Sequence, residues 1–290
     1  MMKMITLTTF ALILPGCVLV IDKDDGDWNS YDGLVTERSV DITNVTVIEN
    51  NFHGRLHIIQ GEDEGVRLRG KSKLLDKVSI ERKGNTLILD TRVDISLDFA
   101  GWGYQYPEKL DVYVTVAKLD RLEGHGRGLV KIETLQTGDL DIEIDGGQLE
   151  VGNLVAENVR IIIDGHGSVR IEELLVTDLT AELNGHGSIE VDFLDSDNLD
   201  LRIAGHGAVD LKGKTETQKV SIEGHGQLSA HGLSSEIARL RIVGHGTARV
   251  WVTSTLSLDV EEHGAVKYKG HPLIEYVSNP AIQQISASED

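Results

Sequence analysis

Histidine recurs at nearly constant spacing between residues 125 and 263, and glycine follows every copy. Six copies have the tripeptide Gly-His-Gly and the last has Glu-His-Gly; the histidines are His125, His166, His186, His206, His225, His245 and His263. Successive copies lie 41, 20, 20, 19, 20 and 18 residues apart, and the long first interval contains Asp145-Gly146-Gly147, a degenerate copy without histidine. Imidazole is a common metal ligand and changes its charge near neutral pH, so the series offers two kinds of chemistry.

The first kind is metal binding. If the copies stack, the histidines form a column whose stems lie about 4.8 Å apart. Imidazoles at that spacing could tilt to share a zinc, copper or nickel ion, and carboxylates beside them could complete or orient the ligand shell. The candidate ligands are His166, His186, His206, His225, His245, His263, Glu223 and Glu262. No closed ligand set follows from the spacing, so no cofactor is expected beyond a divalent ion.

Two other interpretations of the histidine series remain open. A column of imidazoles would repel itself once protonated, so the edge could respond to pH, and nearby carboxylates would oppose that repulsion. Alternatively, histidine is an ordinary solvent-facing residue of a corner that stacks well and was copied with the repeat. The spacing alone does not distinguish between these interpretations.

The residues around each histidine alternate between apolar and polar types, which is typical of β-strands. The third residue before the histidine is aliphatic, as in Leu183 and Ile203, and polar residues such as Glu182 and Arg202 stand next to it. Glycines allow a close corner between two such runs in each copy. A fixed period of about 20 residues with this alternation predicts a solenoid, in which stacked copies bury a continuous aliphatic core.

The predicted fold class is therefore all-β, a parallel β-helix (solenoid) with rungs of about 20 residues. Residues 121–278 are expected to form the β-helix repeats. Residues 34–120 contain further alternating runs and the hairpin-type turn Lys83-Gly84-Asn85, so they are expected to form an N-terminal β-rich cap and the first coils. Residues 279–290 are expected to be a disordered tail.

The N-terminus has the pattern of an export signal. An apolar stretch follows Lys3, and Leu14-Pro15-Gly16-Cys17 resembles a bacterial lipobox that contains the only cysteine of the chain. We expect residues 1–16 to be a lipoprotein signal peptide, Cys17 to be lipidated and residues 17–33 to be an acidic tether.

This N-terminal signal sequence implies that the protein is attached to a membrane through the lipid. Valine, and not aspartate, follows the cysteine, which favours the outer membrane by resemblance to Gram-negative lipoprotein sorting. The alternative is an uncleaved anchor over residues 5–21, a stretch at the lower limit for a spanning helix.

The chain is strongly acidic, with 47 Asp and Glu against 28 Lys and Arg in 290 residues and a formal net charge of −19. A protein that binds nucleic acid needs a basic face, so nucleic acid is not an expected partner, and acidic polysaccharide is disfavoured as the main ligand. The sequence has no nucleophile elbow, phosphate loop or zincin helix, and no carboxylate pair stands out as an acid and base. An enzyme is therefore not expected.

Four segments resemble the putative auto-transporter adhesin head GIN domain family. They are Phe52–Gly61, Leu74–Val78, Leu119–Gly126 and Lys269–Pro272, and the resemblance covers about residues 36–278. It implies a right-handed β-helix on a secreted or lipid-anchored bacterial protein, with adhesion as the suggested role. The residue between the corner glycines is commonly serine in the family, whereas here it is histidine.

Together these features predict a lipid-anchored β-helix of the cell envelope that acts as a binding or structural module, with adhesion to a glycan or a partner protein. The alternative function is metal binding or pH sensing by the histidine series. A polysaccharide-acting enzyme is a third hypothesis, which rests only on the activities that this fold hosts elsewhere.

Overall fold

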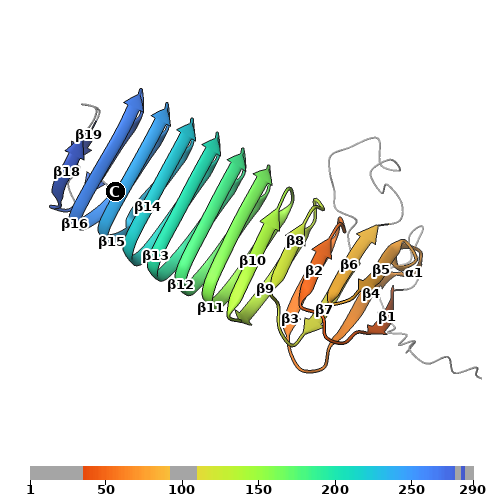
Figure 1. The fold of residues 1–290 in the computed structure, drawn as a ribbon. Helices are drawn as coiled ribbons and strands as arrows, with labels where there is room; N and C mark the ends of the chain where they lie inside the picture. The colour runs from red at the N-terminus through yellow and green to blue at the C-terminus, as the bar shows by residue number, and fades with distance from the viewer. Residues whose placement is uncertain (1–34, 92–109, 278–281, 285–290) are drawn as a thin grey trace, which may run out of the picture.

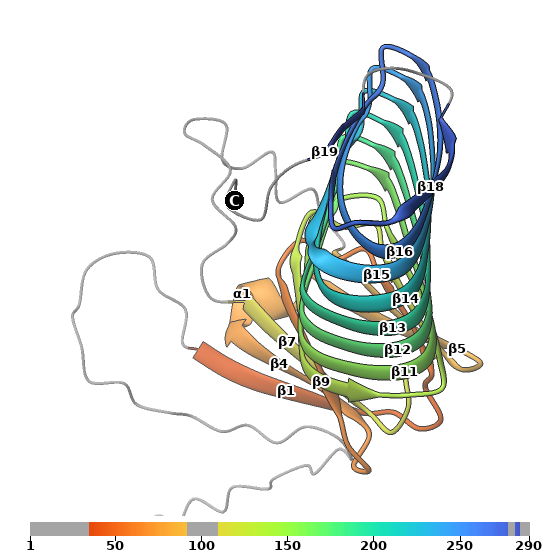
Figure 2. The same ribbon diagram turned by 90° about the vertical axis from the view of Figure 1, so that its left-hand side faces the viewer.

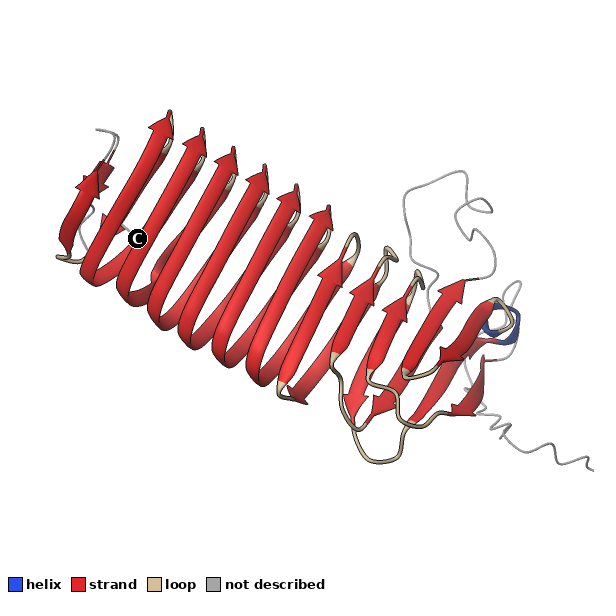
Figure 3. Cartoon of the chain, viewed as in Figure 1, coloured by secondary structure: helices blue, strands red, loops and turns tan. Residues whose placement is uncertain are grey.

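The computed structural model describes residues 35–91, 110–277 and 282–284, which form an elongated β-solenoid of about 8 turns (Figure 1). Strands account for nearly all of these residues, and the one helix among them, α1 (Ser72–Leu75), has four residues (Figure 3). The prediction of an all-β solenoid is confirmed. The predicted signal peptide, Cys17 and the acidic tether lie outside the described residues.

Each rung in the regular part of the solenoid is a single long strand that bends around the core. These strands are β11 (Gln148–Gly165), β12 (Ser168–Gly185), β13 (Ser188–Gly205), β14 (Ala208–Gly224), β15 (Gln227–Gly244) and β16 (Thr247–Glu262). Neighbouring rungs pair in parallel and nearly in register, so Ile163 lies beside Leu183 and Leu183 beside Ile203. Figure 2 shows the bends of successive rungs in line along the rod.

The first rungs with a Gly-His-Gly or degenerate corner are built from shorter strands. They comprise β8 (Arg121–Gly124), β9 (Leu129–Gln136) and β10 (Asp139–Ile144). The strands β8 and β10 pair in parallel, and β9 pairs in parallel with β11. The repeat therefore continues across the degenerate copy at residues 145–147.

The N-terminal region adds rungs in an order that differs from the sequence. The strands β2 (Val47–Asn50) and β3 (Arg55–Gln60) form a rung that lies between β8/β9 and the pair β6 (Thr86–Thr91) and β7 (Leu110–Val116). Beyond that pair, the parallel stack ends in antiparallel strands.

These antiparallel strands are β5 (Val78–Lys83) on β6, β4 (Gly65–Lys71) on β7, and β1 (Val35–Asp41) on β4. The predicted hairpin turn joins β5 to β6, and its Gly84 has a φ of 65°, a left-handed conformation that suits glycine. The antiparallel strands cover the open end of the solenoid, which would otherwise offer unpaired backbone groups to other chains.

The opposite end consists of β17 (Ala265–Lys269), β18 (Leu273–Val277) and β19 (Ile282–Gln284). The strand β19 differs from our expectation, because it lies within the segment predicted to be a disordered tail. It pairs in parallel with β17, whose backbone offers hydrogen-bonding groups on that side. Within the ranges that the structure describes, no helix is long and apolar enough to cross a membrane.

Columns of stacked aliphatic side chains fill the interior of the rod. One column holds the residue three before each histidine, and its members are at most 2% exposed: Ile163, Leu183, Ile203, Ile222, Ile242 and Val260. Burying one such side chain contributes about 1.5–3 kcal/mol to stability, so each rung is stabilised mainly by its two neighbours. This core fixes which side chains point outward at the corners.

Candidate functional site

The Gly-His-Gly corners require glycine on both sides of the histidine, as the corner at His186 shows. At Gly185 the backbone φ is 124°, and an added Cβ would lie 2.7 Å from the carbonyl oxygen of Gly165. At Gly187 a Cβ would lie 2.5 Å from the carbonyl oxygen of Gly167. Side chains other than hydrogen are excluded at both places, because the rungs approach too closely there.

The histidine between the two glycines is held by its backbone, and its side chain is exposed. The amide of His186 donates a hydrogen bond of 2.8 Å to the carbonyl of Gly165, and the amide of His206 does the same to Gly185. Every histidine from His166 to His263 in the series repeats this backbone arrangement with the preceding rung. The fold therefore dictates the glycines, whereas it leaves the identity of the residue between them free.

Six imidazoles stack into one column, which we call the histidine edge: His166, His186, His206, His225, His245 and His263. Ring centroids of neighbours lie 4.8 to 5.2 Å apart, and their planes differ by 1° to 8°. The prediction of a column is confirmed. The rung spacing sets the ring separation, because each ring projects from the same position of its rung.

This stacking limits how the histidine edge could hold a metal. Two nitrogens bound to one zinc ion cannot be farther apart than about 4.2 Å, since each Zn–N bond is about 2.0–2.1 Å. Rings that are parallel and at least 4.8 Å apart point their nitrogen lone pairs side by side and not toward a common point. Neighbouring histidines must therefore rotate out of the stack before they can share an ion.

The two carboxylates that were predicted as metal ligands occupy different positions in their rungs. Glu223 accepts a hydrogen bond of 3.2 Å from Arg202 Nη2 of the preceding rung. Glu262 occupies the place of a corner glycine, since it pairs with Gly244 and has a φ of 58°. The carboxylate two residues before His263 is Glu261, which is bound by Arg241 at 2.9 Å. Glu262 therefore lies in the corner itself, and its role as a metal ligand stays a prediction.

Among residues 35–91, 110–277 and 282–284, one group brings three possible ligand atoms within 4.8 Å of one another: Glu143, Asp145 and Asp164. Each member already has a partner. Arg121 binds Glu143 at 2.9 Å, His125 binds Asp145 at 2.6 Å, and the amide of Asn184 donates to Asp164 at 2.8 Å. The group is thus part of the ion-pair network of the surface.

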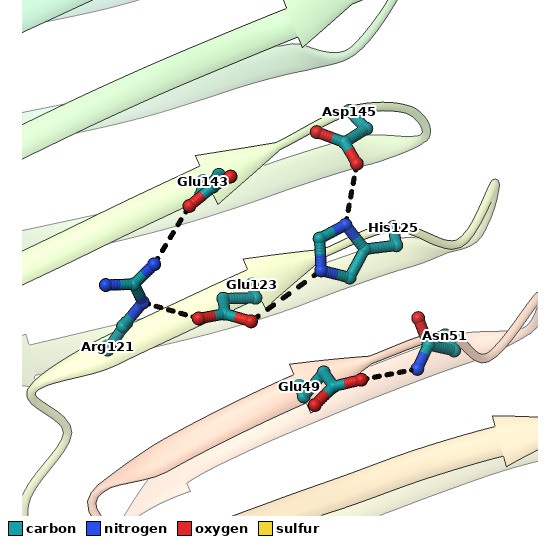
Figure 4. A network of polar contacts seen from close by, with 7 residues as sticks. All are labelled: Glu49, Asn51, Arg121, Glu123, His125, Glu143 and Asp145. Atoms are coloured by element: carbon teal, nitrogen blue, oxygen red, sulfur yellow. Dashed lines mark hydrogen bonds and ion pairs between the residues drawn. The ribbon is translucent and has the colours of Figure 1, made fainter.

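His125 is separated from the histidine edge by the degenerate copy. Ile144 pairs with Ile163, and Gln148 pairs with Ser168. The corner between Ile144 and Gln148 therefore has three residues, whereas the corner between Ile163 and Ser168 has four. The residue that the shorter corner lacks is the histidine. The imidazole of His125 instead turns to carboxylates, as Figure 4 shows.

The contacts of His125 raise its pKa. Its Nδ1 lies 2.6 Å from Asp145 Oδ2, and its Nε2 lies 3.6 Å from Glu123 Oε2 (Figure 4). The hydrogen bond with Asp145 is the largest cause of the raised pKa, and burial opposes it. Arg121 holds both Glu123 and Glu143 in place, at 2.5 and 2.9 Å, so the charges around the imidazole are fixed.

We expect this contact to make stability depend on pH. Because the pKa of His125 is higher in the folded chain, the ion pair stabilises the fold fully below about pH 6.5 and is lost as pH rises through the folded pKa. The exposed setting limits the effect to on the order of 0.5 kcal/mol. Urea unfolding of the wild type and of Asp145→Asn should differ at about pH 5.5 and converge at about pH 8.5; an equal difference at both values would contradict this assignment.

The surface also has a hollow that the sequence analysis did not predict. A hollow of about 440 Å³ lies on the face formed by the strand segments just after the corners of β13 to β16. Its lining includes Asp210 and Arg249, together with hydroxyl and amide side chains. The signal that could have found it is the series of fourth residues after each histidine, where charge pairing across rungs stops.

The sequence matches the family described as "Putative auto-transporter adhesin, head GIN domain" over residues 44–173 and again over residues 156–272. No curated protein matches the chain. The two family matches together span the solenoid from the β2–β3 rung to β17.

Three solved structures have a similar fold. A putative adhesin from Parabacteroides distasonis ATCC 8503 is 19% identical, with 88% of this chain and 98% of that chain covered and a TM-score of 0.64. A putative adhesin from Parabacteroides merdae ATCC 43184 is 18% identical, covering 87% and 96%, with a TM-score of 0.58. A putative lipid binding protein from Parabacteroides distasonis ATCC 8503 is 18% identical, covering 87% and 93%, with a TM-score of 0.50. At these identities the likeness concerns the fold alone.

Proposed function

Because the chain belongs to the family described as "Putative auto-transporter adhesin, head GIN domain", we propose that it is a lipid-anchored binding module of the cell envelope that presents its solenoid to a glycan or a partner protein. The family description implies an envelope- or surface-associated protein with a binding or structural role. The observation that carries the proposal is the repetition of outward side chains in register along the rod, most clearly at the histidine edge. Repeated groups at one spacing suit a ligand that is itself extended and repetitive.

The proposed anchor is the lipid on Cys17, with residues 17–33 as the tether between membrane and solenoid. We expect the wild type to fractionate with the outer membrane and to incorporate labelled fatty acid, and Cys17→Ala to lose both properties. A cleaved, acylated N-terminus at Cys17 in the mass spectrum would identify the modification directly. If Cys17→Ala remains in the membrane with residues 1–16 attached, an uncleaved anchor over residues 5–21 replaces this proposal.

We propose that the protein acts by binding and not by catalysis. The adhesin family supports this role, and the carboxylates of the solenoid surface are extensively used in ion pairs between rungs, such as those of Arg160 with Glu182 and Lys219 with Asp200. A screen of polysaccharides for new reducing ends or unsaturated products tests this statement, and release of either product by the purified chain would contradict it.

A second candidate function is divalent-ion binding at the histidine edge, and the observation that favours it is the unbroken column of six exposed imidazoles. We expect that Zn²⁺, Cu²⁺ or Ni²⁺ binding, measured by calorimetry, is lost when His186, His206 and His225 are changed together to serine. His231→Ser is the matched control, because His231 lies outside the column. Binding that is unchanged in the triple variant would exclude the edge as a metal site.

A further inference from the structure

The strand segment after each corner forms one face of the rod, here called the post-corner face. The fourth residue after each histidine points outward on it, and these residues pair rung by rung: Arg170, Glu190, Asp210, Ser229, Arg249 and Lys267. Neighbours in such a column lie about 4.8 Å apart at their backbones, so opposite charges stabilise the stack and like charges destabilise it.

In the first rungs of this face, basic and acidic side chains neutralise each other. Lys131 binds Glu150 at 2.7 Å, and Arg170 binds Glu190 at 3.0 Å and Asp192 at 2.7 Å. The side chains on this part of the face are thus satisfied by the protein itself.

The pairing stops at Asp210. Asp210 follows Glu190 in the column, and its Oδ1 is buried without a hydrogen-bond partner in the described part of the chain. Asp210 as a whole is partly exposed and lines the hollow, so a donor from outside would reach its other oxygen, Oδ2.

Two cations face each other at the C-terminal end of the same column. Arg249 pairs in register with Lys267, and neither forms an ion pair or a side-chain hydrogen bond within residues 35–91, 110–277 and 282–284. Trp251 and Lys269 follow Arg249 and Lys267, respectively, by two residues. Lys269 Nζ lies 4.4 Å from the ring centroid of Trp251 and adds a third positive charge. Like charges on neighbouring strands repel one another, so an anion bound beside these cations would relieve the repulsion.

The hollow of about 440 Å³ lies between Asp210 at one end and Arg249 at the other. Small and polar side chains, including Ala208, Gln227, Ser229 and Thr247, line it together with Glu190 and the buried residues Ile189, Val209 and Leu228. Asp210 and Arg249 are two rungs apart, about 9.5 Å, and both line it. The hollow therefore offers hydroxyl and amide groups between a hydrogen-bond acceptor at one end and cations at the other.

We propose that this hollow binds a short segment of acidic glycan, whose carboxylate or sulfate lies against Arg249 and Lys267 while its hydroxyls bond Asp210, Ser229 and Thr247. A glycan matches the lining better than a peptide does. Peptides bind to open sheet edges or insert apolar anchors, whereas the strands β13 to β16 each have a paired neighbour on both sides. The aliphatic residues of the lining, Ile189, Val209 and Leu228, are buried in the core and offer little surface to an apolar anchor. The inference rests on the proposed binding function and places it at one site.

The acidity of the whole chain does not oppose an anionic ligand at this place. Charges more than about 8 Å apart on an exposed surface are largely screened at physiological ionic strength. The groups within that distance of the expected anion include Arg249, Lys267 and Lys269. The lining holds two carboxylates, Glu190 and Asp210, toward one end, and the cations Arg249 and Lys267 lie at the other end, where the anionic group of the ligand is placed.

The test uses the full-length chain in detergent on an array of uronate-bearing, sialylated, sulfated and neutral oligosaccharides. We expect acidic oligosaccharides to be retained, the double variant Arg249→Gln/Lys267→Gln to bind them at least about 10-fold more weakly, and Asp210→Ala to bind several-fold more weakly. Arg239→Gln is the matched control, because it removes the same charge from β15 outside the hollow and should change affinity less than about 2-fold. Affinity should also fall as NaCl is raised.

The same variants, labelled and applied to cells, separate this inference from the proposed function. If the wild type and the double variant are retained on cells equally strongly, the site is wrong but the binding function stands. The same holds if the wild type binds neutral glycans as well as it binds acidic ones. Wild type that is retained neither on cells nor on the array would overturn both. Circular dichroism of each variant checks that the solenoid is intact, so a loss of binding reports on the hollow.

Discussion

Replacing Gly185 by alanine is expected to lower the free energy of unfolding by about 3 kcal/mol or more, measured by urea denaturation followed by circular dichroism. The backbone φ of 124° is strained for any residue with a side chain, and the new Cβ would lie 2.7 Å from the carbonyl oxygen of Gly165. The three nearest atoms all belong to Gly165, so the corners of β11 and β12 would have to move apart.

Two further variants isolate the cause of this loss. Gly138→Ala is the matched control, because no atom lies within 4 Å of its added Cβ, and its effect should stay within about 0.5 kcal/mol. His186→Ser should be equally mild, since the side chain is exposed and only the backbone amide is bonded. If Gly185→Ala costs no more than these two, the corner is not the constraint that we describe.

Removing the ring of Phe52 is expected to cost about 3–5 kcal/mol. Phe52 is fully buried where the β2–β3 rung meets β8, and its ring occupies the space that a side chain at Gly54 would need, with an added Cβ only 2.2 Å from Cζ. Phe52→Ala would leave a cavity between the cap and the regular rungs, so the N-terminal strands should lose protection first.

Hydrogen exchange combined with urea unfolding measures this effect. In Phe52→Ala, amides of β2, β3, β6 and β7 should exchange faster, whereas amides of β13 to β15 should be unchanged, because each rung contacts only its neighbours. His53→Ala removes the adjacent exposed side chain and should leave both measurements as in the wild type. Uniform acceleration along the whole chain would contradict the local role of Phe52.

The sequence predicted the regular part of the solenoid because its repeat is both periodic and alternating. The period places His186 beside His206, and the alternation places Leu183 and Ile203 inside, so the histidine edge follows from counting residues. At the last copy the tripeptide is Glu-His-Gly, and Glu262 takes the place of the first glycine beside Gly244.

The order of the N-terminal rungs could not be predicted in the same way. The placement of β2 and β3 between β8/β9 and β6/β7 depends on pairings between segments that are far apart in sequence and share no repeat. The hollow on the post-corner face was not predicted either, because the series of fourth residues indicates where charge pairing stops but not that a cavity is left beside Asp210 and Arg249. A missing partner becomes visible only when all neighbours have been placed.

The equivalence of successive corners makes the rod modular. Gly-His-Gly at residues 185–187 and at residues 205–207 meet the same environment, so excising the stretch between them would join two matching ends and shorten the molecule by one step of about 4.8 Å. Duplication of the same stretch would lengthen it equally. A change in copy number therefore adjusts the length of the rod between its two end regions and requires no new kind of contact.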